Sequence, residues 1–349
     1  MSGGVDSSLA AALLKEEEYE VIGLTLKMHD GGLELGGSGE ADLDSVSAAG
    51  RAARSMGIPH RVLDVRGDFQ EKVIDYFIED YRQGRTPNPC IICNREIKFA
   101  TLERYAREQG ADYIATGHYA RVEYSPSTGR YLLRKGVDIR KDQSYMLFNL
   151  SQVQLSRCLF PLGFLTKQQV RRRARQFNLR AADRAESQEI CFIPDNDYRQ
   201  FLRQRDLPFT PGPIVDTSGR QLGTHRGLAG YTIGQRRGLG LTTSVPLYVL
   251  EIRPGDNMLV VGRKEELYRS AIVVEKFNYL SIASLSTGES VGIKIRYRSP
   301  EAPARLEQVE ASSLRALFDD PQPAITPGQA AVFYRGDLVL GGGIIRGSG

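Results

Sequence analysis

Hydrophobic positions in the first 120 residues alternate between two patterns. Helical spacing occurs at 9–14, 45–56, 69–81 and 95–109, and short runs rich in β-forming residues occur at 20–26, 61–65 and 112–116. Each β-rich run follows a helical pattern, as in a series of strand–helix–strand units. The N-terminal pattern therefore predicts an α/β fold with a doubly wound parallel sheet.

The pattern changes after about residue 200, where β-rich runs are separated by turn signals such as Pro254-Gly255-Asp256-Asn257. The runs at 247–252 and 258–261 flank this turn and predict a hairpin. Later runs at 272–274, 290–297, 330–334 and 338–345 predict a small antiparallel β-barrel. A chain of 349 residues exceeds what one core usually takes up. We expect an α/β domain at 1–200, a small, mostly β central domain at 201–268 and a C-terminal barrel at 269–349.

The most informative loop is Ser2-Gly3-Gly4-Val5-Asp6-Ser7-Ser8, which runs directly into a helical pattern. Its glycines let the backbone approach an anion, and its hydroxyl and N–H groups can hold phosphate oxygens at a helix N-terminus. A Walker A loop would need Lys before its Ser or Thr, and a dinucleotide fingerprint would need GxGxxG. The loop instead resembles the signature of the ATP pyrophosphatase (PP-loop) class. The alternative is a serine-glycine coil that only caps the helix.

A loop of this class normally follows a parallel strand. No apolar run precedes Ser2 in this chain. We therefore expect the chain to begin late, after the first strand of its sheet, since a genuine start here would leave the sheet one strand short.

Composition is that of an ordinary globular protein, with 41% hydrophobic and 25% charged residues. We find neither a run of about eighteen apolar residues nor a cleavable leader, so we expect no membrane partner and a cytoplasmic location. Four cysteines form no disulfide framework and suit a reducing compartment. The net charge of +4 is mild, but 36 arginines against 10 lysines favour a polyanionic partner or reflect a GC-rich genome.

One segment is strongly basic. Between 167 and 180 the basic residues are Lys167, Arg171, Arg172, Arg173, Arg175 and Arg180, with no acidic residue among them. Such a run fits the phosphate backbone of a nucleic acid, and its alternative is a solvated helix face. Few aromatic residues are interleaved, so the segment would position RNA rather than read bases.

Two cysteines follow a rigid loop with two prolines, Thr86-Pro87-Asn88-Pro89. Because Cys93 precedes the predicted helix at 95–109, we expect the helix N-terminus to favour its thiolate. The alternatives are half of a structural zinc site, for which no second CxxC exists, and a buried inert pair. Cys158 lies in an apolar context and is expected to be a core residue.

Six motifs in a fixed order now carry a family resemblance. They are the loop at 2–8, Arg85-Thr86-Pro87-Asn88-Pro89 leading to Cys93-Asn94, Ala115-Thr116-Gly117-His118-Tyr119, Lys141-Asp142-Gln143-Ser144-Tyr145, Ile190-Cys191-Phe192-Ile193, and Thr232-Ile233-Gly234-Gln235-Arg236. Together the motifs resemble the tRNA-specific 2-thiouridylases (tRNA-uridine 2-sulfurtransferases), and the resemblance spans nearly the whole chain.

The resemblance implies a reaction in which ATP turns the 2-oxygen of a wobble uridine into a leaving group by adenylating it. Pyrophosphate would leave into the loop at 2–8, with Mg²⁺ bridging the phosphates and Asp6 as a candidate contact. By the same resemblance, Cys191 would carry sulfur from a donor protein as a persulfide. Cys93 would release that sulfur and leave a Cys93–Cys191 disulfide for reduction.

The resemblance also implies binding residues. For the nucleotide they are Ser2, Gly3, Gly4, Val5, Asp6, Ser7, Ser8, Leu26 and Gly117; for the target base they are Asn88, Pro89 and Cys90; and for tRNA they are His118, Lys141, Asp142, Gln143, Arg296, Tyr297 and Gln329. Without the resemblance, His118 could equally be a strand-end histidine whose hydrogen bonds are made within the protein. Residues 141–143 could equally form a turn exposed to solvent. Both β-rich domains are expected to hold the anticodon arm.

Cys90 departs from the family pattern, because many relatives have Asp at this position. With Cys93 and Cys191 it makes three soft ligands, enough for an iron–sulfur cluster with one open iron. The persulfide route is the preferred expectation and the cluster is its competitor. Two other functions stay open: a PP-loop ligase that adenylates a small molecule, and a non-catalytic tRNA-binding protein with a relict nucleotide loop.

Overall fold

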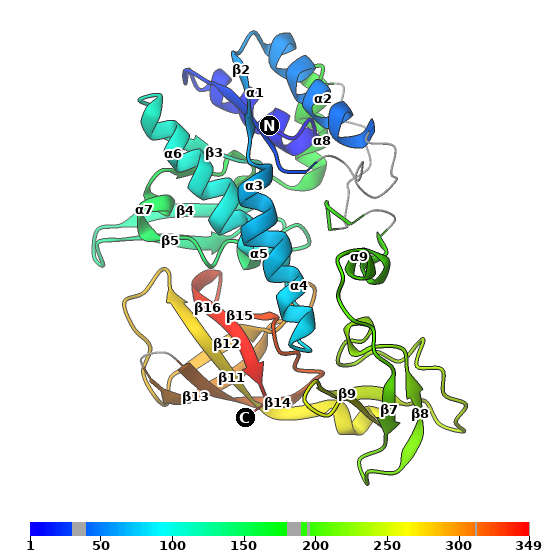
Figure 1. The fold of residues 1–349 in the computed structure, drawn as a ribbon. Helices are drawn as coiled ribbons and strands as arrows, with labels where there is room; N and C mark the ends of the chain where they lie inside the picture. Colours follow the sequence, from blue (N-terminus) through cyan, green and yellow to red (C-terminus); the bar gives the residue numbers. More distant parts are fainter. Residues whose placement is uncertain (30–39, 180–189, 194–195, 311–312, 349) are drawn as a thin grey trace.

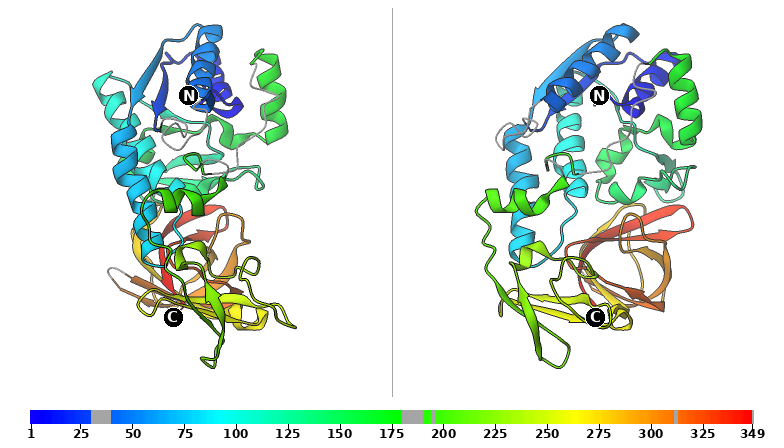
Figure 2. Two further views of the ribbon diagram at one scale, coloured as in Figure 1. Left: turned by 45° about the vertical axis from the view of Figure 1, so that its right-hand side comes forward. Right: turned by 90° about the vertical axis from the view of Figure 1, so that its right-hand side faces the viewer.

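A computed structural model describes residues 1–29, 40–179, 190–193, 196–310 and 313–348. Figure 1 shows an N-terminal part of helices and short strands, a barrel and a separate four-stranded sheet. The barrel and this sheet lie together at the end of the molecule opposite α1 (Val5–Glu16) and α2 (Glu40–Met56), as Figure 2 shows.

Two parallel strand pairs form the N-terminal sheets, and three of their four strands, all but the last along the chain, overlap runs that the alternating pattern predicts. They are β1 (Gly23–Lys27) with β2 (His60–Asp64), and β3 (Ile114–Ala115) with β6 (Cys158–Leu159). Among the described residues no ladder joins the two pairs. Met1 lies beside β1, since its amino group donates to Leu24 O and its carbonyl accepts from Thr25 Oγ1 at 2.8 Å. The phosphate-type loop therefore starts at the edge of β1.

Two long helices have π-helical middle sections. The first comprises α3 (Arg66–Phe69), η2 (Gln70–Ile74) and α4 (Asp75–Arg82), and the second comprises α5 (Pro89–Ile92), η3 (Cys93–Phe99) and α6 (Ala100–Glu108). The prediction that the second helix begins at 95 is wrong. It begins at Pro89, because proline suits the first turn of a helix and Asn88 supplies an extended N-cap. Both thiols of the CxxC pair thus lie within the helix.

Four short elements complete the N-terminal part: η4 (Ser144–Met146), α7 (Gln152–Ser156), η5 (Pro161–Phe164) and α8 (Lys167–Gln176). A capping box between Thr166 and Gln169 fixes the start of α8. Val170 and Ala174 of α8 pack in one cluster with Leu9 of α1. None of the helices in the described ranges is long and apolar enough to cross a membrane.

The middle of the chain forms the four-stranded sheet, reached through α9 (Tyr198–Gln204). In spatial order its strands are β8 (Gln221–His225), β7 (Gly212–Val215), β10 (Met258–Gly262) and β9 (Tyr248–Arg253), with the 3₁₀ turns η8 (Leu228–Gly230) and η9 (Lys264–Leu267) beside them. The hairpin predicted at 247–261 is confirmed, because β9 and β10 pair antiparallel.

The C-terminal strands close into an antiparallel barrel, which confirms the predicted architecture. Their spatial order is β11 (Tyr268–Tyr279), β14 (Ser313–Pro323), β13 (Ala302–Val309), β12 (Ser290–Lys294), β15 (Ala330–Arg335) and β16 (Leu338–Gly347), and β16 pairs back with β11. The interior is apolar, with Ile272, Ile293, Leu306 and Phe333 fully buried. This closure leaves the barrel without a free edge between β11 and β16.

A hairpin from the N-terminal part attaches to the barrel, which the sequence pattern did not reveal. β4 (Ala120–Ser125) pairs with β5 (Arg130–Lys135), and β5 pairs with β16. The carboxylate of Asp337 accepts from Arg121 at 2.7 Å and from Arg134 at 2.6 Å. Burial raises the pKa of Asp337, but the hydrogen bonds and charges of Arg134 and Arg121 together outweigh it and hold this pKa below its usual value. The hairpin thus ties the α/β part to the barrel.

Candidate active site

The loop at 2–8 is shaped to receive an anion. Gly3 has φ +71°, a conformation that favours glycine, and Gly4 precedes α1 with no side chain capping the helix. The Ser2 backbone N–H donates to Ser7 Oγ at 3.0 Å, which draws the loop into a curl. The first N–H groups of α1 therefore lack a side-chain cap, as at phosphate sites on helix N-termini.

Gly117 packs directly against this loop. A Cβ at Gly117 would lie 2.7 Å from Asp6 C, and 2.9 Å from both Asp6 O and Ser7 N. Only glycine fits there without displacing backbone. Ser8 beneath the loop is fully buried, and its Oγ has no hydrogen-bond partner in the described structure. Two segments expected to bind nucleotide are thus in contact, although 110 positions separate them.

The carboxylate of Asp6 is already engaged by two side chains that the sequence analysis did not connect with it. Lys167 Nζ lies 2.9 Å from both carboxylate oxygens, and Tyr119 donates its hydroxyl to Asp6 Oδ1 at 2.8 Å. Gln143 holds Tyr119 in turn, since Tyr119 N donates to Gln143 Oε1 at 3.0 Å and Gln143 N to Tyr119 O at 2.9 Å. Lys167 therefore contacts the loop, which the sequence analysis did not expect, while contact of the basic segment at 167–180 with RNA stays a prediction.

Unlike Lys167, the described arginines of that segment are exposed to solvent. They are Arg171, Arg172, Arg173 and Arg175 of α8, and Arg173 pairs with Glu16 at 3.5 Å. An open hollow is lined by Lys167, Gln168, Arg171, Arg172 and Arg175. Arg180 lies outside the described residues. Four of the six basic residues named in the sequence analysis thus lie on the surface.

Cys93 and Cys191 lie in one neighbourhood. Cys93 is buried, and its thiol lies 3.9 Å from Met28 Sδ. Phe192 and Ile193, which follow Cys191, belong to the same apolar cluster as Cys93, and Leu26 packs against that cluster from the end of β1. The end of β1 therefore connects the nucleotide loop to the thiols.

The thiols are protonated at neutral pH in this state. Burial raises the pKa of Cys93 and Cys90, and it raises that of Cys191 to about 12, while Lys98 acts in the opposite direction on all three. Cys90 and Cys191 are nevertheless exposed to water. We call the group of Cys90, Cys93, Cys191 and Lys98 the thiol recess. The expectation of a Cys93 thiolate is therefore wrong for this state, because desolvation outweighs the helix dipole.

Lys98 is a site residue that the sequence analysis missed. Burial lowers its pKa, but the thiols of Cys93, Cys90 and Cys191 together outweigh burial and raise it. In a regular α-helix, residues five apart point about 140° away from each other. The π-helical hydrogen bonding of η3 brings such residues to the same side, which explains how Lys98 comes to act on Cys93.

His118 lies next to this group and is affected by the charge of Lys98. Its Nδ1 lies 2.8 Å from Thr116 Oγ1, and its ring centroid lies 5.9 Å from that of Phe99, next to Lys98. Burial, and then the charge of Lys98, lower the pKa of His118 to about 3. Its imidazole is therefore neutral at physiological pH.

Several residues expected to bind tRNA make intramolecular contacts here. Asp142 is buried and accepts from Gly136 N at 3.0 Å and from Ser144 Oγ at 2.9 Å. Arg296 donates to Pro323 O at 3.2 Å. Lys141 is half-buried, and the Tyr297 ring lies 6.0 Å from that of Tyr145. Asp142 and Arg296 thus form hydrogen bonds within the protein, while contact of these residues with tRNA stays a prediction.

Gln329 and Asn88 belong to the loop that leads to the thiols. Gln329 Nε2, from the barrel, donates to Thr86 O at 2.8 Å and to Pro87 O at 3.3 Å. Asn88 Nδ2 lies 4.0 Å from Met146 Sδ, Pro89 is buried and Cys90 is exposed. The barrel thereby positions the segment expected to meet the target base.

The described residues contain no group of three His, Cys, Asp or Glu side chains arranged to hold a metal ion. Lys98 interacts electrostatically with Cys90, Cys93 and Cys191. The three thiols are thus not arranged to hold one metal ion in this structure. For Mg²⁺, Asp6 is the expected ligand and is here paired with Lys167.

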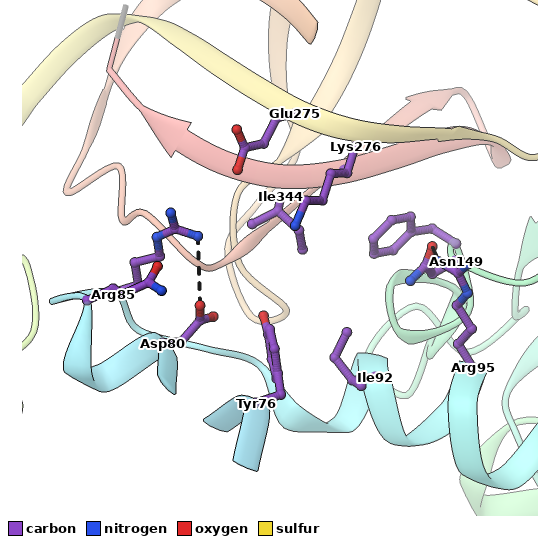
Figure 3. A pocket seen from close by; sticks show the side chains of 12 residues that line it. Tyr76, Asp80, Arg85, Ile92, Arg95, Asn149, Glu275, Lys276 and Ile344 are labelled. Atoms are coloured by element: carbon purple, nitrogen blue, oxygen red, sulfur yellow. Dashed lines mark hydrogen bonds and ion pairs between the residues drawn. The ribbon is translucent and has the colours of Figure 1, made fainter. Parts of the chain in front are cut away.

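A cavity of about 410 Å³ lies on another face of the thiol-bearing helix (Figure 3). Tyr76, Asp80 and Ile92 face Lys276 and Ile344 of the barrel across it, as Figure 3 shows. None of the cysteines lines it. The cavity therefore marks the junction of the α/β part and the barrel rather than the thiol site.

Comparison with known proteins follows this geometry. Three family models match, described as the tRNA methyl transferase HUP domain (residues 1–195), the tRNA methyl transferase PRC-barrel domain (199–263) and the aminomethyltransferase beta-barrel domain (269–345). A relative from Moorella thermoacetica is 51% identical over 349 residues, covering 99% of this chain and 98% of the relative. One from Carboxydothermus hydrogenoformans is 50% identical over 350 residues, covering 99% and 96%. Both are named tRNA-specific 2-thiouridylase MnmA.

Gly117→Ala should weaken nucleotide binding, because the new methyl group would push the backbone of Asp6 and Ser7. Overpacking costs roughly 1–3 kcal/mol, so we expect the affinity for a non-hydrolysable ATP analogue to fall by about 10- to 100-fold. Calorimetric titration measures this. Gly67→Ala is the matched control, since nothing lies within 4 Å of its added Cβ. Equal affinities in the two variants would contradict the proposed contact.

Lys98→Met should raise the pKa of all three recess thiols, because it removes the charge that lowers them. At pH 8 the thiolate fraction then falls, and Cys90 and Cys191 should react several-fold more slowly with iodoacetamide. Peptide mass spectrometry across a pH series gives both rates, with Lys98→Arg as the charge-preserving control. Unchanged pH–rate profiles in Lys98→Met would show that Lys98 does not act on these thiols.

Proposed function

The chain belongs to the tRNA-specific 2-thiouridylase family, and from this premise we propose that it catalyses ATP-dependent 2-thiolation of the wobble uridine in tRNA. The observation that carries the proposal is the joining of a phosphate-type loop to a two-cysteine recess through the end of β1. In this proposal residues 1–200 perform the chemistry, and 201–268 and 269–349 contribute to tRNA binding.

The first step would activate the base. The uracil 2-oxygen attacks the α-phosphate of ATP, the bond to the β-phosphate breaks and pyrophosphate leaves. The curl at 2–8 and the first N–H groups of α1 would hold the leaving pyrophosphate. Mg²⁺, when bound, would neutralise phosphate charge. Asp6 is the residue we assign to it, once Lys167 releases the carboxylate.

The second step would transfer sulfur. A persulfide on Cys191, loaded by a sulfur-donor protein, attacks C2 of the adenylated base, and AMP leaves with the former 2-oxygen. Cys93 then attacks the Sγ of Cys191, which breaks the S–S bond and frees the 2-thiouridine. The Cys93–Cys191 disulfide that remains needs two electrons from a thiol reductant. Lys98 favours each anionic sulfur in this sequence, since its charge lowers the pKa of both thiols.

The base would enter beside Asn88, Pro89 and Cys90. Gln329 holds this segment from the barrel, so a tRNA gripped by the barrel would meet a fixed entrance. Exposed Arg171, Arg172 and Arg175 offer contacts to the phosphate backbone. A ligase acting on a small molecule would leave both the thiol recess and the full-length similarity to 2-thiouridylases without explanation.

Cys93→Ser and Cys191→Ser should each abolish thiolation of the tRNA while leaving binding of the ATP analogue unchanged. Thiolation is measured by mass spectrometry of digested tRNA. Cys158→Ala is the matched control, because Cys158 is buried in the apolar core beside Ile114 and Phe160. Retained thiolation in either serine variant would remove that cysteine from the mechanism.

Cys90→Ser separates the persulfide route from the cluster. Two cysteines suffice for the persulfide route, so we expect thiolation to persist at a reduced rate. A cluster held by three cysteines would lose a ligand, and both activity and protein-bound iron would disappear. Iron and acid-labile sulfide are measured after anaerobic purification beside the thiolation assay. Stoichiometric iron in the original protein, lost with activity in Cys90→Ser, would contradict the persulfide route.

A further inference from the structure

The phosphate-type loop has no cationic side chain of its own. Residues 2–8 contain neither lysine nor arginine, and their one charged side chain is Asp6, which has the same sign as a phosphate. The N–H groups and dipole of α1 attract anions. A polyphosphate bound next to Asp6 would still be repelled unless a cation stood close by.

Lys167 places such a cation at the loop from far along the chain. Its Nζ lies 2.9 Å from both oxygens of Asp6 and 5.6 Å from the centre of the Tyr119 ring. The Lys167 side chain is 10% exposed, whereas that of Asp6 is 31% exposed. The more open side of this ion pair is therefore its carboxylate, on the loop.

The position of Lys167 is set before any ligand arrives. The capping box of Thr166 and Gln169 fixes the first turn of α8, and Lys167 N donates to Asp138 Oδ2 at 3.0 Å. Val170, one turn on, packs in the same cluster as Val5 of α1. The lysine thus loses little further freedom when it binds an anion, which favours affinity.

Stability alone does not account for this ion pair. Withdrawing two charges from water costs as much as their attraction returns, and such pairs are often replaceable by apolar residues without loss. The pair also lies at the one loop that the proposed reaction uses for pyrophosphate. Its placement fits a ligand-binding role better than a structural one.

We propose that Lys167 is the phosphate-binding cation of this site and that Asp6 occupies it while the nucleotide is absent. When the pyrophosphate portion of ATP enters the loop, the ammonium group of Lys167 exchanges the Asp6 carboxylate for phosphate oxygens. Lys167 thereby takes the part that a loop lysine plays in Walker A proteins. This inference rests on the proposed function, since it requires a nucleotide site at residues 2–8.

The test is calorimetric binding of inorganic pyrophosphate, without metal, to the full-length protein. Lys167→Met should weaken binding by about 10- to 100-fold, the worth of charge-assisted hydrogen bonds. Lys135→Met is the matched control. Lys135 also pairs with a carboxylate, that of Glu301, and lies 4.4 Å from the centre of the Tyr334 ring. The Lys135→Met variant should bind pyrophosphate as tightly as the original protein.

The Asp6→Asn variant should change the affinity for pyrophosphate in the opposite direction from Lys167→Met. Removing the competing carboxylate should tighten metal-free pyrophosphate binding several-fold, and Lys167→Arg should retain most of the affinity. These two variants decide the question if Lys167→Met fails to fold. Unchanged binding in Lys167→Met, or weakened binding in Asp6→Asn, would overturn the role of Lys167 and leave the proposed function intact. Absence of metal-free pyrophosphate binding by the original protein would also overturn the role of Lys167, whereas the proposed function is tested separately by the thiolation assay.

Discussion

The close packing of Gly117 against the backbone of Asp6 and Ser7 is the contact on which the site depends. It joins the phosphate-type loop to the segment after β3, where His118 follows at once. His118 lies beside Phe99 and feels the charge of Lys98, and Lys98 in turn interacts with the three thiols. A series of contacts thus runs from the nucleotide loop to the sulfur chemistry, and only a residue without a side chain permits its first step.

The three thiols of this group are protonated at neutral pH, and Lys98 is the cation that interacts with them. Burial raises the pKa of Cys90, Cys93 and Cys191, while Lys98 lowers it. Neutral thiols resist adventitious oxidation and alkylation, since the thiolate is the reactive form. In the proposed reaction, sulfur becomes nucleophilic when a proton leaves beside Lys98. The barrel contributes at a distance, because Gln329 holds the backbone of Thr86 and Pro87 just before the thiol-bearing helix.

Local patterns of the sequence predicted much of this fold. The parallel pair β1–β2, the β9–β10 hairpin and the closed barrel follow from apolar periodicity and turn residues, whereas β6, the partner of β3, was not predicted. The start of the thiol-bearing helix was misplaced, because the proline that suits its first turn also suits a loop. The attachment of the β4–β5 hairpin to the barrel was missed because its partner β16 lies some 200 residues later. Lys167 and Asp6 are 161 positions apart, and Lys98 reaches Cys93 only through a π-helix. Neither pair, Lys167–Asp6 or Lys98–Cys93, can be predicted from the spacing of residues in the sequence.

The central claim is that Cys191 and Cys93 act in succession in the transfer of one sulfur atom: Cys191 delivers it, and Cys93 then releases it from Cys191. It is tested most directly by a single turnover without reductant, in which Cys191 is first loaded as a persulfide and then given ATP and tRNA. Peptide mapping should find a Cys93–Cys191 disulfide in the same amount as the 2-thiouridine formed. Formation of 2-thiouridine with both thiols still free would contradict the account.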